Sequence, residues 1–221
     1  MITSTIENYV KQIYLQVQKT EVELLPMGKL ASAMGVVPGT ATAMVKTLAD
    51  SGLVDYEPRS GIRLTAGGVQ LALHVLRRHR IVELFLVDIL GLDWSEVHAE
   101  AEALEHAISE KVIERMDLML EHPQFDPHGD PIPSAKGSVR HVRVAPLSTI
   151  EPGSTVVIAR ISDQDPQFLQ FMERNGLTPK VNITLTERNE LADAITVQLK
   201  NKETVTLGGK AAEKILVRAS G

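Results

Sequence analysis

Hydrophobic positions in the first 65 residues change from helical spacing to alternation. Apolar side chains recur at three- and four-residue intervals over 4–17 and again from Met27 to Met34, and a third helix is predicted over 40–51. Two short helices joined by a Gly-containing turn form a helix-turn-helix pattern. Strands predicted over 53–57 and 61–65 flank a Pro-Arg-Ser-Gly turn, so a hairpin follows as a wing. The pattern predicts a winged helix-turn-helix DNA-binding domain over residues 1–72.

The rest of the chain divides into a helical part and a strand-rich part. One long apolar helix is predicted from Thr65 to Gly91 and another from about Ser95 to Glu121. Both are too apolar to stand alone, so we expect a helical metal-binding and dimerisation domain over 73–140. Pro and Gly punctuate the segment after 122. Strands predicted over 154–161, 181–186, 194–199, 204–207 and 215–217, with a helix over 166–175, then indicate a small β-barrel over 141–221.

Composition narrows the class of protein further. The 221 residues are 43% hydrophobic and include no cysteine, which excludes disulfides, thiolate metal sites and thiol nucleophiles. The N-terminus lacks the pattern of a signal peptide, and no apolar run approaches the ~20 residues that span a bilayer. We therefore expect a cytoplasmic protein without a membrane partner.

Charge and histidine concentrate in the same middle third. Residues 81–140 carry 13 acidic and 4 basic side chains, a net charge of −9, whereas residues 1–80 are net +3. All seven histidines fall between positions 74 and 141. The basic N-terminal third suits phosphate, and the acidic middle suits a cation.

Carboxylates and imidazoles in this middle third recur at helical spacing. His98, Glu102, Glu105 and His106 lie at i, i+4, i+7 and i+8 of the second predicted helix, and His79 and Glu83 form an i, i+4 pair on the preceding one. Such oxygen and nitrogen donors suit Mn²⁺, Fe²⁺, Co²⁺ or Zn²⁺. The alternative is a solvated acidic helix face. Asp126 and His128, with Glu83, form a second possible cluster, for which a polar loop is an equally good interpretation.

Taken together, these residues resemble the diphtheria toxin repressor family of iron- and manganese-dependent transcriptional regulators. The resemblance covers nearly the whole chain. It rests on the following segments: Glu7–Tyr14, the winged helix, Arg78-His79-Arg80 with Glu83, Glu102-x-x-Glu105-His106, His128–Pro133, and a C-terminal barrel like SH3 or iron-transport protein A.

The resemblance implies a ligand set. The primary site would use Asn8, His79, Glu102, Glu105 and His106, and the glutamate at position 102 is the manganese-responsive choice where iron-responsive members have cysteine. A second site would draw on Glu83, His98, Asp126 and His128, and the barrel would add Asp163 and Gln167. The sequence departs from the family at two positions: Asn8 stands where Met or Asp is usual, and Lys11 stands where some manganese-responsive members have Glu.

The resemblance also implies a function. We expect a homodimeric repressor that binds double-stranded operator DNA and controls manganese or iron homeostasis, with Mn²⁺ or Fe²⁺ as the activating ion, Co²⁺ or Zn²⁺ as substitutes in vitro, and no catalytic residues. In the winged helix itself, Thr40, Thr42 and Lys46 are the outward positions of the recognition helix, and Arg59 and Arg63 lie on the wing, where they would contact bases or phosphates. Two alternatives stay open: a metal-dependent hydrolase, and a winged-helix regulator that senses an organic ligand.

Overall fold

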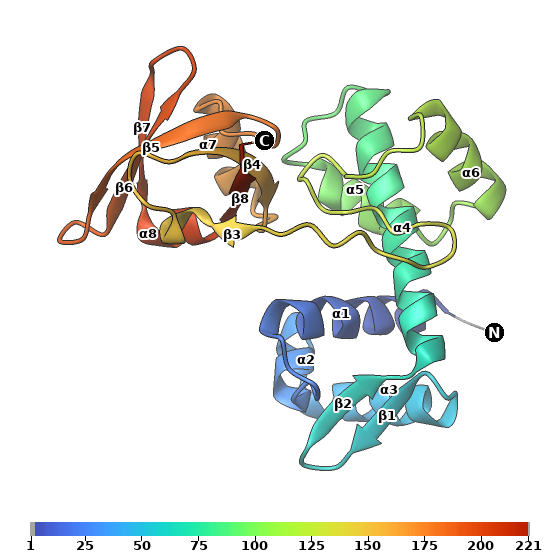
Figure 1. The fold of residues 1–221 in the computed structure, drawn as a ribbon. Coiled ribbons are helices and arrows are strands. Elements are labelled where there is room, and N and C mark those ends of the chain that lie inside the picture. The colour runs from blue at the N-terminus through green and yellow to red at the C-terminus, as the bar shows by residue number, and fades with distance from the viewer. Residues whose placement is uncertain (1–2, 221) are drawn as a thin grey trace. The chain divides into compact units, whose positions relative to one another are not determined.

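The structure, a computed structural model, describes residues 3–220 (Figure 1). Its helices are α1 (Ser4–Thr20), α2 (Met27–Ala33), α3 (Pro38–Asp50), α4 (Ala66–Asp88), α5 (Val97–Leu104), α6 (Glu110–Met119), the 3-10 helix η1 (Leu147–Thr149), α7 (Pro166–Arg174) and α8 (Gly209–Glu213). Its strands are β1 (Val54–Glu57), β2 (Gly61–Leu64), β3 (Ala145–Pro146), β4 (Thr155–Ile161), β5 (Asn182–Asn189), β6 (Ala194–Leu199), β7 (Thr204–Gly208) and β8 (Ile215–Ala219).

The chain forms two compact units. The first contains the chain up to His79 together with 105–107 and 133–139, and the second contains 80–104, 108–132 and the chain from Arg140 onward. The division falls inside α4, and the short segment 105–107 joins the first unit although its neighbours on both sides belong to the second.

The first unit is the predicted winged helix. Pro38 is the first residue of α3, a position that suits proline because its missing N–H has no helical partner there. Strands β1 and β2 pair antiparallel from Val54 opposite Leu64 to Glu57 opposite Gly61, which forms the wing. The core of this unit joins one face of α1 to α2, α3 and the hairpin through the following buried side chains: Tyr9, Val10, Ile13, Leu25, Leu30, Val45, Leu48, Val54, Ile62 and Ala72.

The helical part of the second unit differs from the sequence prediction in one respect. The helix expected from Ser95 to Glu121 is two helices, because α5 ends at Leu104 and α6 begins only at Glu110. Ser109 has extended backbone angles as the N-cap of α6. The interruption arises because Glu105 makes buried ion pairs with residues of the first unit, which draw the 105–107 turn out of the helical path. No spacing of apolar residues reveals such a tertiary interaction.

The C-terminal part of the second unit is a six-stranded antiparallel sheet in the order β3-β8-β4-β5-β6-β7. Each predicted strand is present, and α7 lies where a helix was expected. Within residues 3–220 no pairing joins β3 to β7, so the sheet is open rather than a barrel closed by hydrogen bonds. The same hydrophobic core includes Trp94, which comes from the segment between α4 and α5 and so ties the helical part to this sheet.

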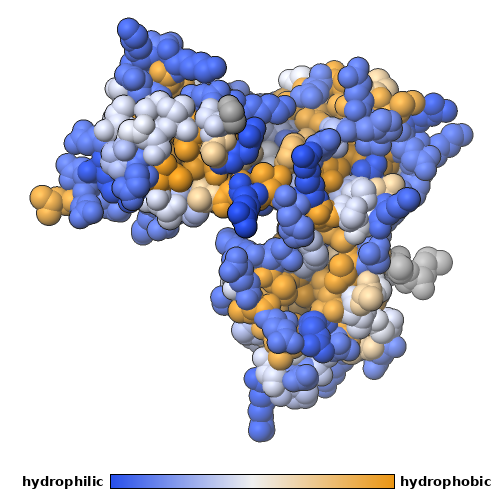
Figure 2. Space-filling model, in the orientation of Figure 1, coloured by the Kyte–Doolittle hydropathy of each residue, from blue (hydrophilic) through white to orange (hydrophobic). Residues whose placement is uncertain are grey.

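Helix α6 leaves part of its apolar surface uncovered. Val112, Leu118 and Met119 are 44%, 54% and 59% exposed, whereas Ile113 on the opposite face is buried. Figure 2 shows apolar surface over this helical region. Among the described helices, none combines the length and the apolar character needed to cross a bilayer.

The loop 126–130 is held against β4 at close range. Ile161 donates its backbone N–H to the carbonyl of His128 at 2.9 Å, and Arg160 contacts Asp130 at 3.2 Å. Gly129 has a φ of +88°, and a Cβ at this position would lie 2.0 Å from the carbonyl oxygen of Ala159. Only a residue without a side chain permits this approach.

We predict that Gly129→Ala destabilises the protein by about 2 kcal/mol or more, because the new methyl group meets backbone that cannot move aside. Gly153→Ala is the matched control, since Gly153 has nearly the same φ of +87° but no neighbour within 4 Å. Thermal unfolding of both variants measures the difference. Equal losses would show that the positive φ alone, and not contact with β4, determines the effect.

Candidate metal centre and DNA-binding surface

One face of α1 presents polar side chains to the first candidate site. Glu7, Asn8 and Lys11 lie at i, i+1 and i+4 of this helix. The turn that follows α5 contributes Glu105 and His106. All five residues belong to the first compact unit, as do Arg78 and His79 of α4. We call these seven residues the α1 cluster.

Glu105 is the fully buried centre of the α1 cluster. Its Oε1 lies 2.6 Å from Lys11 Nζ, and its Oε2 lies 2.6 Å from His79 Nδ1. Burial alone would raise the pKa of Glu105, but the hydrogen bonds and charges of His79 and Lys11 outweigh burial and lower it. Glu105 is therefore held as a carboxylate, the form that binds a metal ion.

His106 is held by two side chains of α1. Its Nδ1 lies 2.5 Å from Glu7 Oε2, and its Nε2 lies 2.7 Å from Asn8 Oδ1 and 3.2 Å from Glu105 Oε1. Glu7 is in turn paired with Arg78 at 2.6 Å. The arrangement brings together four of the five residues expected in the primary site: Asn8, His79, Glu105 and His106.

Glu7 and Arg78 are functional candidates that the ligand prediction missed. Both lie next to a predicted ligand in sequence, Glu7 beside Asn8 and Arg78 beside His79. The i, i+4 spacing of Glu7 and Lys11 on the first helix was a detectable signal, because it places a carboxylate and an ammonium on the same face as Asn8. Lys11 was noted only as a departure from the family pattern.

Glu102, the fifth expected primary ligand, belongs to the second unit. It lies on α5, and its Oε1 is 3.7 Å from His98 Nε2 one turn earlier. His98 Nδ1 is 3.1 Å from Glu83 Oε1 on α4. The structure therefore brings His98 and Glu83 together, as expected for the second site.

Three fully buried residues of the second unit form the next candidate, the Glu83 cluster, made of Glu83, Asp126 and His128. Their oxygen and nitrogen ligand atoms all lie within 4.8 Å of one another. His128 Nε2 is 2.9 Å from the carbonyl oxygen of Trp94. Because a carbonyl only accepts, Nε2 carries a proton, and in the neutral imidazole Nδ1 then has the lone pair that a metal ion binds.

Within the described residues, the buried Nδ1 of His128 has no hydrogen-bond partner. His128 is fully buried, and its Nδ1 lies 4.0 Å from Glu83 Oε2. A metal-binding histidine commonly donates its other N–H to a carbonyl, as His128 does here. The single tryptophan, Trp94, also stacks on the His128 ring at 5.4 Å between centroids.

Asp126 is a carboxylate whose charge its neighbours compensate only in part. Burial raises its pKa well above the usual value, and the nearby Asp130 and Glu83 raise it further, while Arg80 opposes them. Arg80 Nε is 3.6 Å from Asp126, and its guanidinium also contacts Asp130 at 3.2 Å. The cluster thus has more negative charge than its nearest cation balances.

Asp163 and Gln167 are the two ligands predicted from the C-terminal domain, and the structure shows each of them in a different setting. Asp163 pairs with Lys214; burial alone would raise the pKa of Asp163, but the Lys214 hydrogen bond and charge lower it. Gln167 is exposed near the start of α7. Within residues 3–220, Asp163 does not belong to any group of three or more His, Asp or Glu side chains that could hold a metal ion. Their role as ligands stays a prediction.

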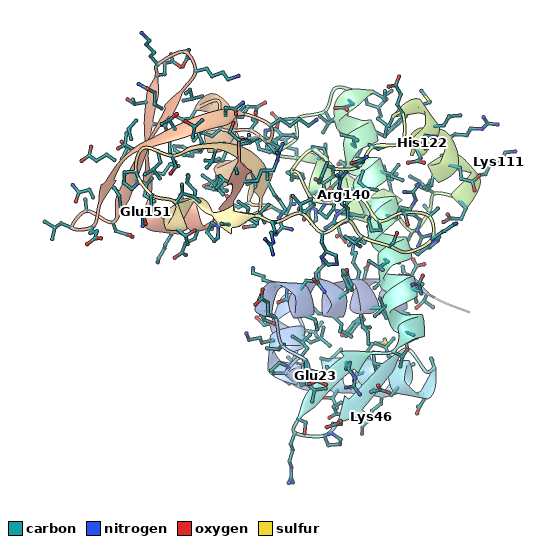
Figure 3. The ribbon with its side chains drawn as sticks, in the orientation of Figure 1. Glu23, Lys46, Lys111, His122, Arg140 and Glu151 are labelled. Atoms are coloured by element: carbon teal, nitrogen blue, oxygen red, sulfur yellow. The ribbon has the colours of Figure 1, made fainter. Side chains whose placement is uncertain are left out.

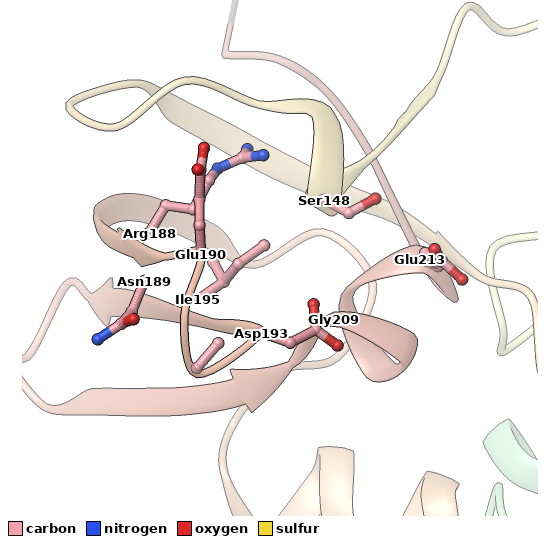
Figure 4. A pocket seen from close by; sticks show the side chains of 9 residues that line it. Ser148, Arg188, Asn189, Glu190, Asp193, Ile195, Gly209 and Glu213 are labelled. Atoms are coloured by element: carbon pink, nitrogen blue, oxygen red, sulfur yellow. The ribbon is translucent and has the colours of Figure 1, made fainter.

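The donors of both clusters fit a divalent metal ion. Carboxylate and amide oxygens with imidazole nitrogens match manganese, iron, cobalt or zinc, and the unpartnered Nδ1 of His128 beside two carboxylates is the buried donor that such an ion would satisfy. No candidate ligand lines the cavity of about 230 Å³ in the C-terminal domain, which lies near Arg188, Glu190 and Asp193 (Figure 4).

The predicted DNA-contacting residues lie at the surface of the winged helix. Thr40 and Lys46 are exposed on α3, and Thr42 is half-buried with its hydroxyl donating to the carbonyl of Pro38 (Figure 3 labels Lys46). Arg59 lies at the exposed turn of the wing with a φ of +71°. Arg63 is paired with Glu23 at 3.0 Å and Asp55 at 3.4 Å. Thr47 is a further exposed side chain on α3.

Family models match almost the whole chain in succession. The N-terminal DNA-binding domain of iron-dependent repressors matches residues 1–62, the metal-binding and dimerisation domain of the same repressors matches 65–134, and the FeoA domain matches 145–219. A solved structure described as a manganese-dependent transcriptional repressor in complex with manganese is 39% identical, with a TM-score of 0.89 over 97% of this chain and 100% of that chain.

The chain belongs to the diphtheria toxin repressor family. The iron-dependent repressor IdeR of Mycobacterium leprae is 28% identical over 98% of this chain and 97% of its own length. The diphtheria toxin repressor of Corynebacterium diphtheriae is 30% identical over 73% of this chain and 69% of its own length. These matches confirm the expected class of function.

This member of the family is therefore an iron- or manganese-dependent transcriptional repressor. It has a helix-turn-helix DNA-binding domain, a metal-binding and dimerisation domain and an SH3-like FeoA domain. The relatives are transcriptional repressors, and the comparisons give no support to the hydrolase or to the sensor of an organic ligand.

We predict that Asp126→Asn stabilises the repressor in a metal chelator at pH 8. The substitution removes a buried charge that Arg80 compensates only in part, and it keeps an oxygen for the backbone N–H groups of His128 and Asp130. The pKa of Asp126 is raised in the folded state. Above that pKa, the charge of Asp126 therefore lowers the free energy of unfolding by its full amount. The cost disappears as the pH falls toward the ordinary value for aspartate. The stability gained by Asp126→Asn should therefore shrink as the pH falls.

Urea unfolding between pH 4 and pH 8 measures this dependence, with the exposed Glu151→Gln as the control. Added Mn²⁺ should stabilise the parent protein more than the Asp126→Asn variant, since the amide is a weaker ligand than the carboxylate. A variant that is less stable than the parent in chelator at pH 8 would contradict the prediction.

Proposed function

We propose that this repressor acts as a homodimer in the cytoplasm and controls genes of manganese or iron uptake, with the α1 cluster as its primary metal site. The observation that carries the proposal is the contact of Asn8 with His106, 98 positions away in the sequence, beside the buried carboxylate of Glu105. Glu102 and His79 complete the proposed ligand set. The absence of thiolates among these donors, and Glu102 in place of cysteine, favour Mn²⁺ over Fe²⁺.

The proposed second site is the Glu83 cluster with His98. Glu83 is shared between His98 Nδ1 at 3.1 Å and His128 Nδ1 at 4.0 Å, so it joins the two imidazoles. Asp163 and Gln167 are proposed as further ligands when the C-terminal domain contributes. A divalent ion adds positive charge beside the buried Asp126, and so stabilises the loop 126–130 in its position on β4.

The physical basis of activation is linkage between metal binding and the position of α1. Glu105 and His106 follow the dimerisation helix α5, whereas Asn8 lies on the first helix of the winged-helix domain. Ligands drawn together from both elements fix the DNA-binding domain relative to the dimer helices. A dimer presents two recognition helices. Fixing each DNA-binding domain therefore also fixes the distance between these two helices, which decides whether both can enter the major groove. The exposed apolar side chains of α6 are the proposed dimer surface.

The decisive experiment measures operator binding by fluorescence anisotropy with Mn²⁺ or Fe²⁺ and with a chelator. The parent protein should bind DNA at least tenfold more tightly with metal, and Glu105→Gln should lose this gain because an amide is a weaker ligand. Glu151→Gln, an exposed site in the C-terminal domain, is the control and should behave as the parent. Equal operator affinity of the parent in metal and in chelator would rule out the proposal.

We further predict that Lys46→Ala weakens binding to operator and to unrelated DNA by a similar factor, because an exposed lysine on α3 contacts phosphate rather than a base. The slope of log affinity against log salt should fall by about 1. Lys200→Ala, an exposed lysine of the C-terminal domain, should leave both unchanged. A loss confined to the operator would assign Lys46 to base recognition instead.

A further inference from the structure

Lys11 is a lysine in an uncommon position, since its side chain is only 2% exposed. An ammonium group is almost never fully buried unless it is paired. The pairing here is to Glu105, whose carboxylate is fully buried and lies 2.6 Å from Lys11 Nζ. The partner of this buried lysine is therefore the central ligand of the proposed primary metal site.

Both oxygens of Glu105 are already engaged by nitrogen atoms. Lys11 Nζ at 2.6 Å and His106 Nε2 at 3.2 Å share Oε1, and His79 Nδ1 lies 2.6 Å from Oε2. A divalent ion that binds Glu105 through Oε1 comes within a few ångströms of the ammonium. At that separation two positive charges in a buried site repel each other strongly.

Both carboxylates of the α1 cluster already have a cation as partner without a metal. Within the α1 cluster two carboxylates, Glu7 and Glu105, are each paired at 2.6 Å with a cation, Arg78 and Lys11 respectively. Arg78 is the cation that contacts Glu7, whereas Lys11 is the cation that contacts Glu105. Lys11 is therefore the cation whose place the metal would take.

We propose that Lys11 is an internal competitor of the activating metal. Its ammonium holds Glu105 in the metal-free protein, and a divalent ion displaces it, so Lys11 raises the metal concentration at which the repressor becomes active. The inference rests on the proposed primary site. Lys11 belongs to α1, one turn after Glu7 and Asn8. The exchange therefore replaces the ion pair of Lys11 with Glu105 by a link through the metal ion, for which Asn8 of α1 and Glu105 are both proposed ligands.

The first test compares metal affinity in three variants. Mn²⁺ binding is measured by competition with a chelating dye. Lys11→Gln removes the charge but keeps a donor for Glu105, and we expect its Kd for Mn²⁺ to be at least tenfold lower than that of the parent. Lys11→Arg keeps the charge and should remain within threefold. Lys19→Gln, at an exposed lysine of the same helix, should not change the Kd. Unchanged or weaker binding by Lys11→Gln would overturn the proposal.

The second test needs no variant. Trace acetylation of the parent protein, read by mass spectrometry, reports the accessibility of each lysine. In chelator, exposed Lys19 should be labelled and buried Lys11 should not. In Mn²⁺, labelling of Lys11 should rise several-fold, with a midpoint at the Kd of the primary site. Labelling that stays low at saturating Mn²⁺ would show that the ammonium remains in place, and would overturn the proposal.

The two tests separate this inference from the proposed function. A parent protein that binds neither Mn²⁺ nor metal-dependent operator DNA would remove the primary site itself. A parent protein that binds both, with Lys11→Gln unchanged in affinity and Lys11 unlabelled in Mn²⁺, would retain the metal site and remove only the competition.

Discussion

The buried carboxylate of Glu105 is the constraint on which the surrounding structure depends. A carboxylate without solvent must be paired, and here Lys11 and His79 provide the pairing at 2.6 Å each. The need for these partners explains why α5 stops at Leu104 and why the turn 105–107 joins the first unit. It also explains why α1 carries a buried lysine between the core residues Val10 and Ile13. One ionic contact thus links Glu105, a proposed metal ligand, to the helix that opens the DNA-binding domain.

The local sequence pattern was sufficient to predict most helices and strands, because interactions between residues close in sequence determine them. The wing was predictable because Pro58 to Gly61 form a turn between two apolar stretches, and α3 because Pro38 suits the start of a helix. The break between α5 and α6 was not predictable, since Leu104, Ile108 and Val112 keep helical spacing across it. Only the tertiary pairing of Glu105 ends the helix there. The open edge of the sheet between β3 and β7 is likewise a long-range property.

The site was predictable by residue type but not by contact. His79, Glu105 and His106 were identified through spacing and family resemblance, and the structure brings them to one place. Glu7 was overlooked because a single acidic residue in an amphipathic helix resembles a solvated charge. Its pairing with Arg78 and His106 depends on residues more than 70 positions away. The contacts themselves carry no periodic signal, so the sequence offered only the weak hint of the Glu7 and Lys11 spacing beside Asn8.

The two clusters solve the problem of buried negative charge in opposite ways. Glu105 is fully compensated by protein groups, and its pKa is lowered as a result, so a metal ion must exchange with an existing cation. Asp126 is under-compensated and its pKa is raised, so a metal ion at the Glu83 cluster supplies charge that the protein lacks. His128 Nδ1 also has no donor or ion to displace. Metal binding at the second cluster adds positive charge beside Asp126, which Arg80 compensates only in part, whereas we propose that binding at the first replaces the Lys11–Glu105 contact that already holds α1. In the proposed mechanism, the position of α1 couples metal binding to DNA binding. The site that holds α1 is also the site at which the metal must displace Lys11, so this competition sets the metal concentration at which the repressor becomes active.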